Sequence, residues 1–158
     1  MQNSIHNGGE THVKYAHFHF PRTIDVQCPF CSQPSELVNI NASMDTDFFI
    51  DLAPYQKVWT LICNHCLNRK SMSWDDTKKI ELLNKITIRE ETIWAWNTHH
   101  LHYLIGVFSG KEDKNHKWAF YRNYIHKKWF QKTANKSDIL KLENLLSTNI
   151  KSFKRNEI

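Results

Sequence analysis

The chain has 158 residues, of which 41% are hydrophobic and 13% aromatic. This length allows one compact domain or two very small ones, which excludes a large multidomain enzyme, and the aromatic content excludes a disordered chain. With only four Gly and four Pro, and no long apolar run, the sequence is neither collagen-like nor low-complexity, and no segment predicts a membrane span.

Charge is distributed unevenly along the chain. The 21 Lys and Arg outnumber the 16 Asp and Glu, for a formal net charge of +5. Residues 1–77 hold five basic and eight acidic side chains, whereas residues 78–158 hold sixteen basic and eight acidic. A phosphate-bearing partner selects such a basic half by counterion release, although solubility alone explains many surplus lysines.

The first half reads as short strands. Residues 1–12 are polar and predict a flexible N-terminus, and the alternation over residues 13–20 predicts a strand. Segments rich in β-branched and aromatic residues predict further strands at 36–42, 55–62 and 69–74. An acidic loop with Asp45, Asp47 and Asp51 separates the first two of these. Residues 83–89 predict another strand, whereas residues 75–82 could open a helix instead.

The four cysteines form two C-x2-C pairs separated by 31 residues: Cys28, Cys31, Cys63 and Cys66. A two-residue gap lets both thiolates of a pair occupy two corners of a tetrahedron, so two pairs complete a four-thiolate site. The spacing predicts one structural Zn2+ held by all four cysteines. Because no coordination position stays open for water or substrate, the site is not catalytic.

Other uses of the cysteines fit less well. A disulfide scaffold is disfavoured because the N-terminal segment is polar and has no apolar signal region. A thioredoxin-like redox site needs one C-x2-C in a βαβ setting, and this chain has two pairs in hairpin-like surroundings. A four-thiolate iron site has the same geometry, so the sequence leaves zinc and iron open.

Two such pairs joined by antiparallel strands resemble the zinc-ribbon superfamily, and the resemblance covers roughly residues 24–75. The second half also resembles the helical C-terminal half of small bacterial and phage zinc-ribbon proteins. The residues that carry this second resemblance are Trp94, Ala95, Trp96, Asn97, His100, Leu101, Lys128, Trp129, Asn135 and Lys136. It implies a bacterial or phage origin and a similar architecture, but no activity.

Three helices are predicted in the second half. The first spans 98–109, with Asn97 as N-cap and Gly110 at the C-terminal cap. The second spans 115–133 and has an apolar face of Trp118, Tyr121, Arg122, Ile125 and Trp129. The third spans 137–149, with Ser137 as N-cap and with Ile139, Leu142, Leu145 and Leu146 facing inwards.

The predicted fold is therefore α+β, a four-cysteine zinc ribbon of short antiparallel strands followed by a basic three-helix segment. The predicted divisions are a flexible N-terminus (1–12), a zinc-ribbon β module (13–90), a helical module (91–150) and a flexible tail (151–158). The strands of the ribbon are too few to be stable alone, so the metal ion replaces a missing hydrophobic core. Removal of the metal should therefore unfold the ribbon.

The second predicted helix is the candidate binding surface. Opposite its apolar face a helical wheel groups Lys117, Phe120, Tyr124, Lys127 and Lys128. Lysines neutralise phosphates and exposed aromatics stack on unpaired bases, so this surface predicts contact with nucleic acid. The alternative is a helix buried on two sides, whose lysines extend around aromatics that belong to the core.

Catalysis finds little support. The residues after Cys63 look like the second knuckle of metal-stapled HNH nucleases, but residues 32–62 contain no His to act as general base. No G-x-S-x-G, P-loop or G-x-G-x-x-G occurs. Two further His sets lack the spacing of a second metal site: His17 with His19, and His99 with His100 and His102.

The sequence therefore predicts a cytoplasmic, non-enzymatic zinc-binding protein that contacts nucleic acid. The alternative is a protein-interaction adaptor of mobile-element or phage origin with a structural zinc, and a nuclease is the least favoured. No feature indicates a membrane partner or a small-molecule substrate.

Overall fold

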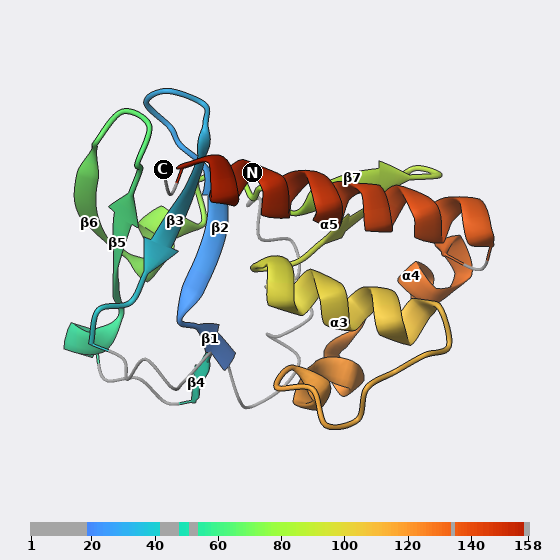
Figure 1. Cartoon of the computed structure of the whole chain (residues 1–158). Helices are drawn as coiled ribbons and strands as arrows, with labels where there is room; N and C mark the ends of the chain where they lie inside the picture. Colours follow the sequence, from blue (N-terminus) through green and yellow to red (C-terminus); the bar gives the residue numbers. More distant parts are fainter. Residues whose placement is uncertain (1–18, 42–47, 51–53, 134, 157–158) are drawn as a thin grey trace.

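The computed structural model describes residues 19–41, 48–50, 54–133 and 135–156. These residues form an α+β fold in which a four-stranded antiparallel sheet lies beside the helices of the second half (Figure 1). The strands are β1 (His19–Pro21), β2 (Thr23–Gln27), β3 (Pro34–Val38), β4 (Phe48–Ile50), β5 (Val58–Ile62), β6 (Arg69–Ser73), β7 (Lys85–Ile88) and β8 (Glu91–Trp94). The α-helices are α2 (Trp74–Thr77), α3 (Thr98–Phe108), α4 (Lys127–Lys132) and α5 (Lys136–Asn156), and the 3-10 helices are η1 (Pro54–Gln56) and η2 (Ala119–Tyr124).

The main sheet has the order β2-β3-β5-β6. Its register pairs Asp25 with Glu36, Leu37 with Leu61 and Trp59 with Met72, and consecutive strands are antiparallel throughout. One C-x2-C pair follows β2 and the other follows β5. Because β3 and β5 are themselves antiparallel, both pairs lie at the same end of the sheet.

The predicted strands at 36–42, 55–62, 69–74 and 83–89 correspond to β3, β5, β6 and β7; all four are shorter than predicted, and β3 begins two residues earlier. Residues 54–56 form η1, and the start of the segment 75–82 lies in α2, as the helical alternative allowed. The predicted flexible N-terminus, most of the predicted strand at 13–20 and the acidic residues of the predicted loop fall outside the described residues. Residues 48–50 of that loop form the strand β4 instead, and the strands β2 and β8 were also not predicted.

The outer edge of β2 is covered by the chain that leads into the second half. Gln27 donates its backbone N–H to the carbonyl of Glu81 at 2.9 Å, and Leu83 donates to the carbonyl of Asp25 at 3.0 Å. Between them Val26 and Leu82 form an isolated antiparallel bridge. This segment continues into the β7–β8 hairpin and then into α3.

Helix α3 begins and ends where the sequence predicts. The side chain of Asn97 accepts the backbone N–H of His100 at 2.9 Å, and its amide donates to the carbonyl of Thr23 in β2. Gly110 follows the helix with a φ of +76°, the left-handed conformation that glycine adopts without cost. Asn97 therefore both caps α3 and joins it to the sheet.

The predicted continuous helix at 115–133 is wrong. Residues 119–124 form η2, in which Tyr121 donates to the carbonyl of Trp118 in an i to i+3 bond. Ile125 and His126 then have extended backbones with ψ of 130°, which end η2 before α4. The side chain of His126 accepts the N–H of Lys128 and starts α4 as a new helix.

Helix α5 is longer than predicted and begins with a different cap. It extends to Asn156, so most of the tail expected to fray is helical. Asn135 accepts the backbone N–H of Asp138 at 3.0 Å, whereas the hydroxyl of Ser137 donates to Asn135. The helix packs against α3, β3 and β7 and so covers both the sheet and the hairpin (Figure 1).

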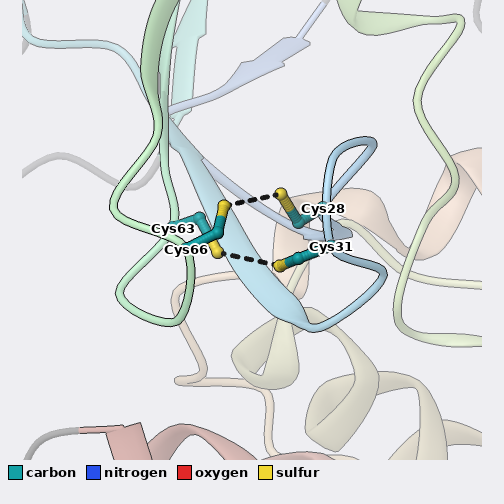
Figure 2. A group of neighbouring side chains, drawn as sticks. All are labelled: Cys28, Cys31, Cys63 and Cys66. Carbon is teal, nitrogen blue, oxygen red and sulfur yellow. Dashed lines mark hydrogen bonds between the residues drawn. The ribbon is translucent and has the colours of Figure 1, made fainter.

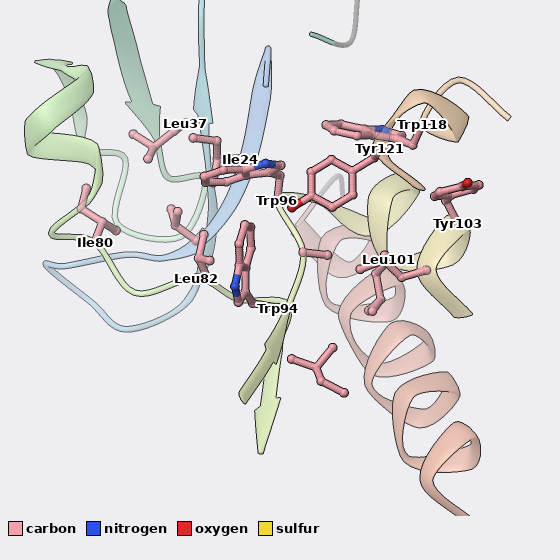
Figure 3. Packing of buried hydrophobic residues seen from close by; sticks show 14 of the residues in the cluster. Ile24, Leu37, Ile80, Leu82, Trp94, Trp96, Leu101, Tyr103, Trp118 and Tyr121 are labelled. Atoms are coloured by element: carbon pink, nitrogen blue, oxygen red, sulfur yellow. The ribbon is translucent and has the colours of Figure 1, made fainter. Parts of the chain in front are cut away.

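One hydrophobic core is built from residues of both halves of the chain (Figure 3). Trp94 and Trp96 lie between the sheet residues Ile24 and Leu37 on one side and helical residues such as Leu101 on the other. Contacting aromatic rings run through this core from the sheet into the second half: Phe20, Trp59, Trp74, Trp96, Trp94 and Trp129. The sheet is thus fixed to the helices by large buried side chains.

Candidate metal centre

The four cysteines converge at one end of the main sheet (Figure 2). The Sγ atoms of Cys28 and Cys66 are 3.7 Å apart, those of Cys31 and Cys63 are 3.5 Å apart, and all four lie within 4.8 Å of one another. Each hairpin turn supplies one buried cysteine and one half-buried cysteine. The sequence prediction that these four residues form one group is confirmed.

The two turns have the same local form. In each, the residue after the second cysteine has a left-handed backbone, with φ of 63° at both Ser32 and Leu67. Cys28 donates its N–H to the carbonyl of Gln33 at 2.8 Å, and Cys63 donates to the carbonyl of Asn68 at 3.1 Å. This repeated geometry presents the two pairs of sulfurs to each other.

The thiols differ in their electrostatic surroundings. The side chain of Asn68 donates to Sγ of Cys66 at 3.1 Å, and with a bond from the Asn68 backbone it lowers the pKa of Cys66 to about 6. Burial, together with hydrogen bonds in which the Cys31 thiol donates to neighbouring cysteine sulfurs, raises the pKa of Cys31 to about 12. The Asn68 bonds therefore favour the thiolate of Cys66, the form that binds a metal ion, whereas burial disfavours the thiolate of Cys31.

The donor set fits a tetrahedral metal ion. With metal–sulfur bonds of about 2.3 Å, the sulfurs of a tetrahedral site lie about 3.8 Å apart, close to the two shortest separations found here. All four cysteines are free rather than joined as disulfides. Four cysteines supply every ligand of such an ion, and the Asn68 amide is the kind of outer hydrogen bond that orients a ligand.

The structure keeps the predicted basic residues in the same segment but not on one helix. Lys117 precedes η2, Phe120 lies in η2, and Lys127 and Lys128 open α4. The three lysines are exposed, and Phe120 is half-buried with its ring stacked 5.6 Å from Trp118. Tyr124 is the last residue of η2, and its side chain is not described.

The predicted apolar face of this segment is largely confirmed. Trp118, Tyr121, Ile125 and Trp129 are buried. Arg122 is the exception, because its guanidinium is on the surface and forms an ion pair with Glu112 at 3.0 Å. The same glutamate accepts a hydrogen bond from the hydroxyl of Tyr103, and this bond holds the Glu112 side chain against α3.

A polar pocket that sequence reasoning missed lies between the sheet and the start of α3. Its volume is about 450 Å3. It is lined by Arg22, Thr23, Asp25, Glu36, Val38, Asn97, Thr98, His99 and Lys117. The sequence did not indicate this pocket. The strand Thr23–Gln27 is too short for its hydrophobic pattern to show which of its faces is covered, so nothing singled out the carboxyl of Asp25.

Asp25 is the buried acid of this pocket. It accepts the side-chain amide of Asn84 at 3.0 Å and the backbone N–H of Thr98 at 2.9 Å. Asn84 in turn accepts the amide of Asn149 from α5 at 2.8 Å. Burial and then the charge of Glu36 raise the pKa of Asp25 to about 7, against the opposing effect of its hydrogen bonds.

A second hollow of about 540 Å3 lies between α3 and α5 and is lined by both helices and by residues 111–116. Its histidines, His102 and His116, have ring centroids 5.7 Å apart. Burial and the charge of His102 lower the pKa of His116. In the described part of the chain, the four cysteines are the only group of three or more His, Cys, Asp or Glu arranged to hold a metal ion.

Comparison with known protein families, with curated proteins and with solved structures returned no match. None of the helices that the structure describes combines the length and apolar character needed to span a bilayer.

Proposed function

We propose that the chain is a non-enzymatic zinc-binding protein that contacts nucleic acid through its basic C-terminal half. The observation that supports the metal is the convergence of four thiols within 4.8 Å, from two turns of the same form. Zinc is the proposed ion because a four-thiolate tetrahedron without an open position is its usual structural site. In this proposal the metal ion links the two cysteine turns of the main sheet, and the sheet supports the rest of the molecule.

Metal analysis of the purified protein tests the first part. We expect one zinc per chain, lost when Cys63 is replaced by Ser, and no charge-transfer absorption in the visible range. A coloured protein with one iron per chain would replace zinc by iron in the same site. Absence of any stoichiometric metal after expression in metal-supplemented medium would contradict the proposal.

The nucleic-acid part is supported by the charge of residues 111–132. They hold seven basic and two acidic side chains. One of the two acids, Glu112, is engaged by Arg122 and Tyr103, while Lys117, Lys127 and Lys128 are exposed. Basic side chains of this density attract a phosphate backbone through counterion release.

A fluorescence-anisotropy titration with single-stranded DNA, duplex DNA and RNA at two salt concentrations tests this part. We expect binding that weakens as salt rises, and loss of that binding when Lys117, Lys127 and Lys128 are all changed to Glu. A matched control changes three exposed lysines outside the segment to Glu: Lys79, Lys141 and Lys151. Failure to bind any of the three at low salt would contradict nucleic-acid contact and favour the adaptor alternative.

A further inference from the structure

Two large apolar side chains are exposed beside the metal centre. Phe30, inside the first cysteine pair, is 56% exposed, and Leu67, directly after the second pair, is 80% exposed. The sulfurs of Cys31 and Cys66, their sequence neighbours, belong to one cluster within 4.8 Å. Both side chains therefore lie at the same end of the sheet, which we call the knuckle tip and define as Phe30, His65, Leu67, Arg69 and Lys70.

The cysteine turn sets a left-handed backbone at residue 67, but local stability does not explain why that residue is a leucine. Its φ of 63° is left-handed, which costs a residue with a Cβ on the order of 1 kcal/mol and which Gly or Asn adopts readily. In the described part of the chain, the other non-glycine residues with a left-handed backbone are all polar: Ser32, Arg89 and Glu90. Burial does not compensate at Leu67, because most of its side chain faces solvent.

The knuckle tip carries exposed cations and no carboxylates. His65, Arg69 and Lys70 are exposed, and residues 27–35 and 63–74 contain no Asp or Glu. Four thiolates with one Zn2+ carry two negative charges, so Arg69 and Lys70 bring the summed charge of the metal-loaded tip to about zero, and the tip does not repel phosphate. The tip thus combines an exposed aromatic ring and an exposed aliphatic side chain with cations, and it lacks carboxylates that would repel phosphate.

We infer that the knuckle tip is a second nucleic-acid contact, which takes an unpaired base of a single strand. Phe30 stacks on the base, Leu67 packs beside it, and Arg69 and Lys70 contact the flanking phosphates. Stacking requires a base that is free of its duplex partner, so the tip favours single-stranded over duplex DNA. This inference rests on the proposed nucleic-acid function and adds a site remote in sequence from the basic segment.

The test uses the zinc-loaded full chain and a thymidine homopolymer of about 30 nucleotides. The variants are Phe30→Ala, Leu67→Asn and the pair combined. Matched controls are Ile40→Ala and Tyr55→Ala, because these side chains are 65% and 77% exposed and lie at the opposite end of the same strands. We expect the combined variant to weaken binding by about tenfold and the controls to leave it unchanged.

A second readout separates a binding role of Leu67 from a structural one. Asn accepts a left-handed backbone more readily than Leu, so Leu67→Asn should keep or raise the melting temperature while it weakens binding. A lower melting temperature would show that Leu67 stabilises the fold and would overturn its part in the contact. Metal content, measured for each variant, confirms that the centre is intact.

The outcomes distinguish this inference from the function on which it rests. Wild-type binding that the triple Lys→Glu variant abolishes, but that the combined tip variant leaves unchanged, overturns the tip contact and keeps the proposed function. Equal loss in the tip and control variants also overturns it. Failure of the wild-type protein to bind the homopolymer or any other nucleic acid contradicts both.

Discussion

The carboxyl of Asp25 shows how one buried side chain couples stability to pH. It is 3% exposed, and the pocket around it also contains Glu36, Arg22, His99 and Lys117. Below its ordinary pKa of 3.8 the group is protonated in both the folded and unfolded chains. Between that value and about 7 only the folded protein keeps the proton, so rising pH removes stability by up to about 1.4 kcal/mol per pH unit.

Replacement of Asp25 by Asn should remove this pH dependence. The amide has the shape of the protonated acid and can still accept from Asn84 and Thr98. Urea unfolding of the metal-loaded proteins at pH 5 and pH 8 measures it. We expect the stability of Asp25→Asn relative to wild type to rise by about 2–3 kcal/mol between the two pH values. A constant difference would contradict the raised pKa.

Asn68 supplies a prediction about the metal centre. Its amide donates to Sγ of Cys66, and loss of such an outer hydrogen bond costs about 10- to 100-fold in metal affinity. Asn68→Ala should therefore lose zinc to a competing chelator at lower chelator concentration than wild type. Asn64→Ala, in the same turn and exposed, is the control. Equal affinities in the two variants would show that the Asn68 bond does not matter.

At the level of the elements, we expect two candidate cap residues, Asn97 of α3 and Ser137 of α5, to differ in how much they stabilise the protein. Asn97 caps α3 and also donates to Thr23 in the sheet, so Asn97→Ala should lower the free energy of unfolding by about 2 kcal/mol. Ser137 was predicted to cap α5, but Asn135 does so, and Ser137→Ala should change stability by less than about 0.5 kcal/mol. Chemical denaturation measures the free energy of unfolding of both variants. A loss of more than about 0.5 kcal/mol in Ser137→Ala would indicate that Ser137 caps α5.

Patterns within one element allowed the accurate predictions. Asn97 and Gly110 mark the ends of α3 by their own chemistry, and the cysteine spacing predicted that all four cysteines come together. The segment 115–133 failed because its apolar spacing fits a continuous helix, whereas burial of Trp118 and Tyr121 is reached through a 3-10 turn. Local periodicity does not distinguish these two ways of burying the same residues.

Features that depend on distant contacts were not predictable. The strand β2 shows no alternation, because its consecutive residues Ile24, Asp25 and Val26 are all buried and both of its faces are therefore covered. Asp25 has its role only because Asn84 and Thr98 come to it from 59 and 73 residues away. A single sequence contains no local trace of such encounters.

For the whole molecule, the shared core changes what metal removal should do. The sequence predicted that chelation unfolds the ribbon, but Cys28 and Cys63 belong to the same buried cluster as Trp94 and Trp129. We therefore expect chelation to lower the melting temperature of the whole protein, with the far-ultraviolet signal and the near-ultraviolet circular dichroism of the tryptophans lost together in one transition. A tryptophan spectrum that persists after the sheet has unfolded would show that the second half folds independently of the metal.

The two edges of the main sheet are protected in different ways. The edge of β2 is covered by the Leu82 segment, whereas no strand in the described residues pairs with the outer edge of β6. That edge carries the exposed Arg69 and Lys70, and like charges on an edge strand oppose its pairing with the same strand of another molecule. These cations therefore also guard against aggregation, and variants that neutralise them would be prone to associate at high concentration.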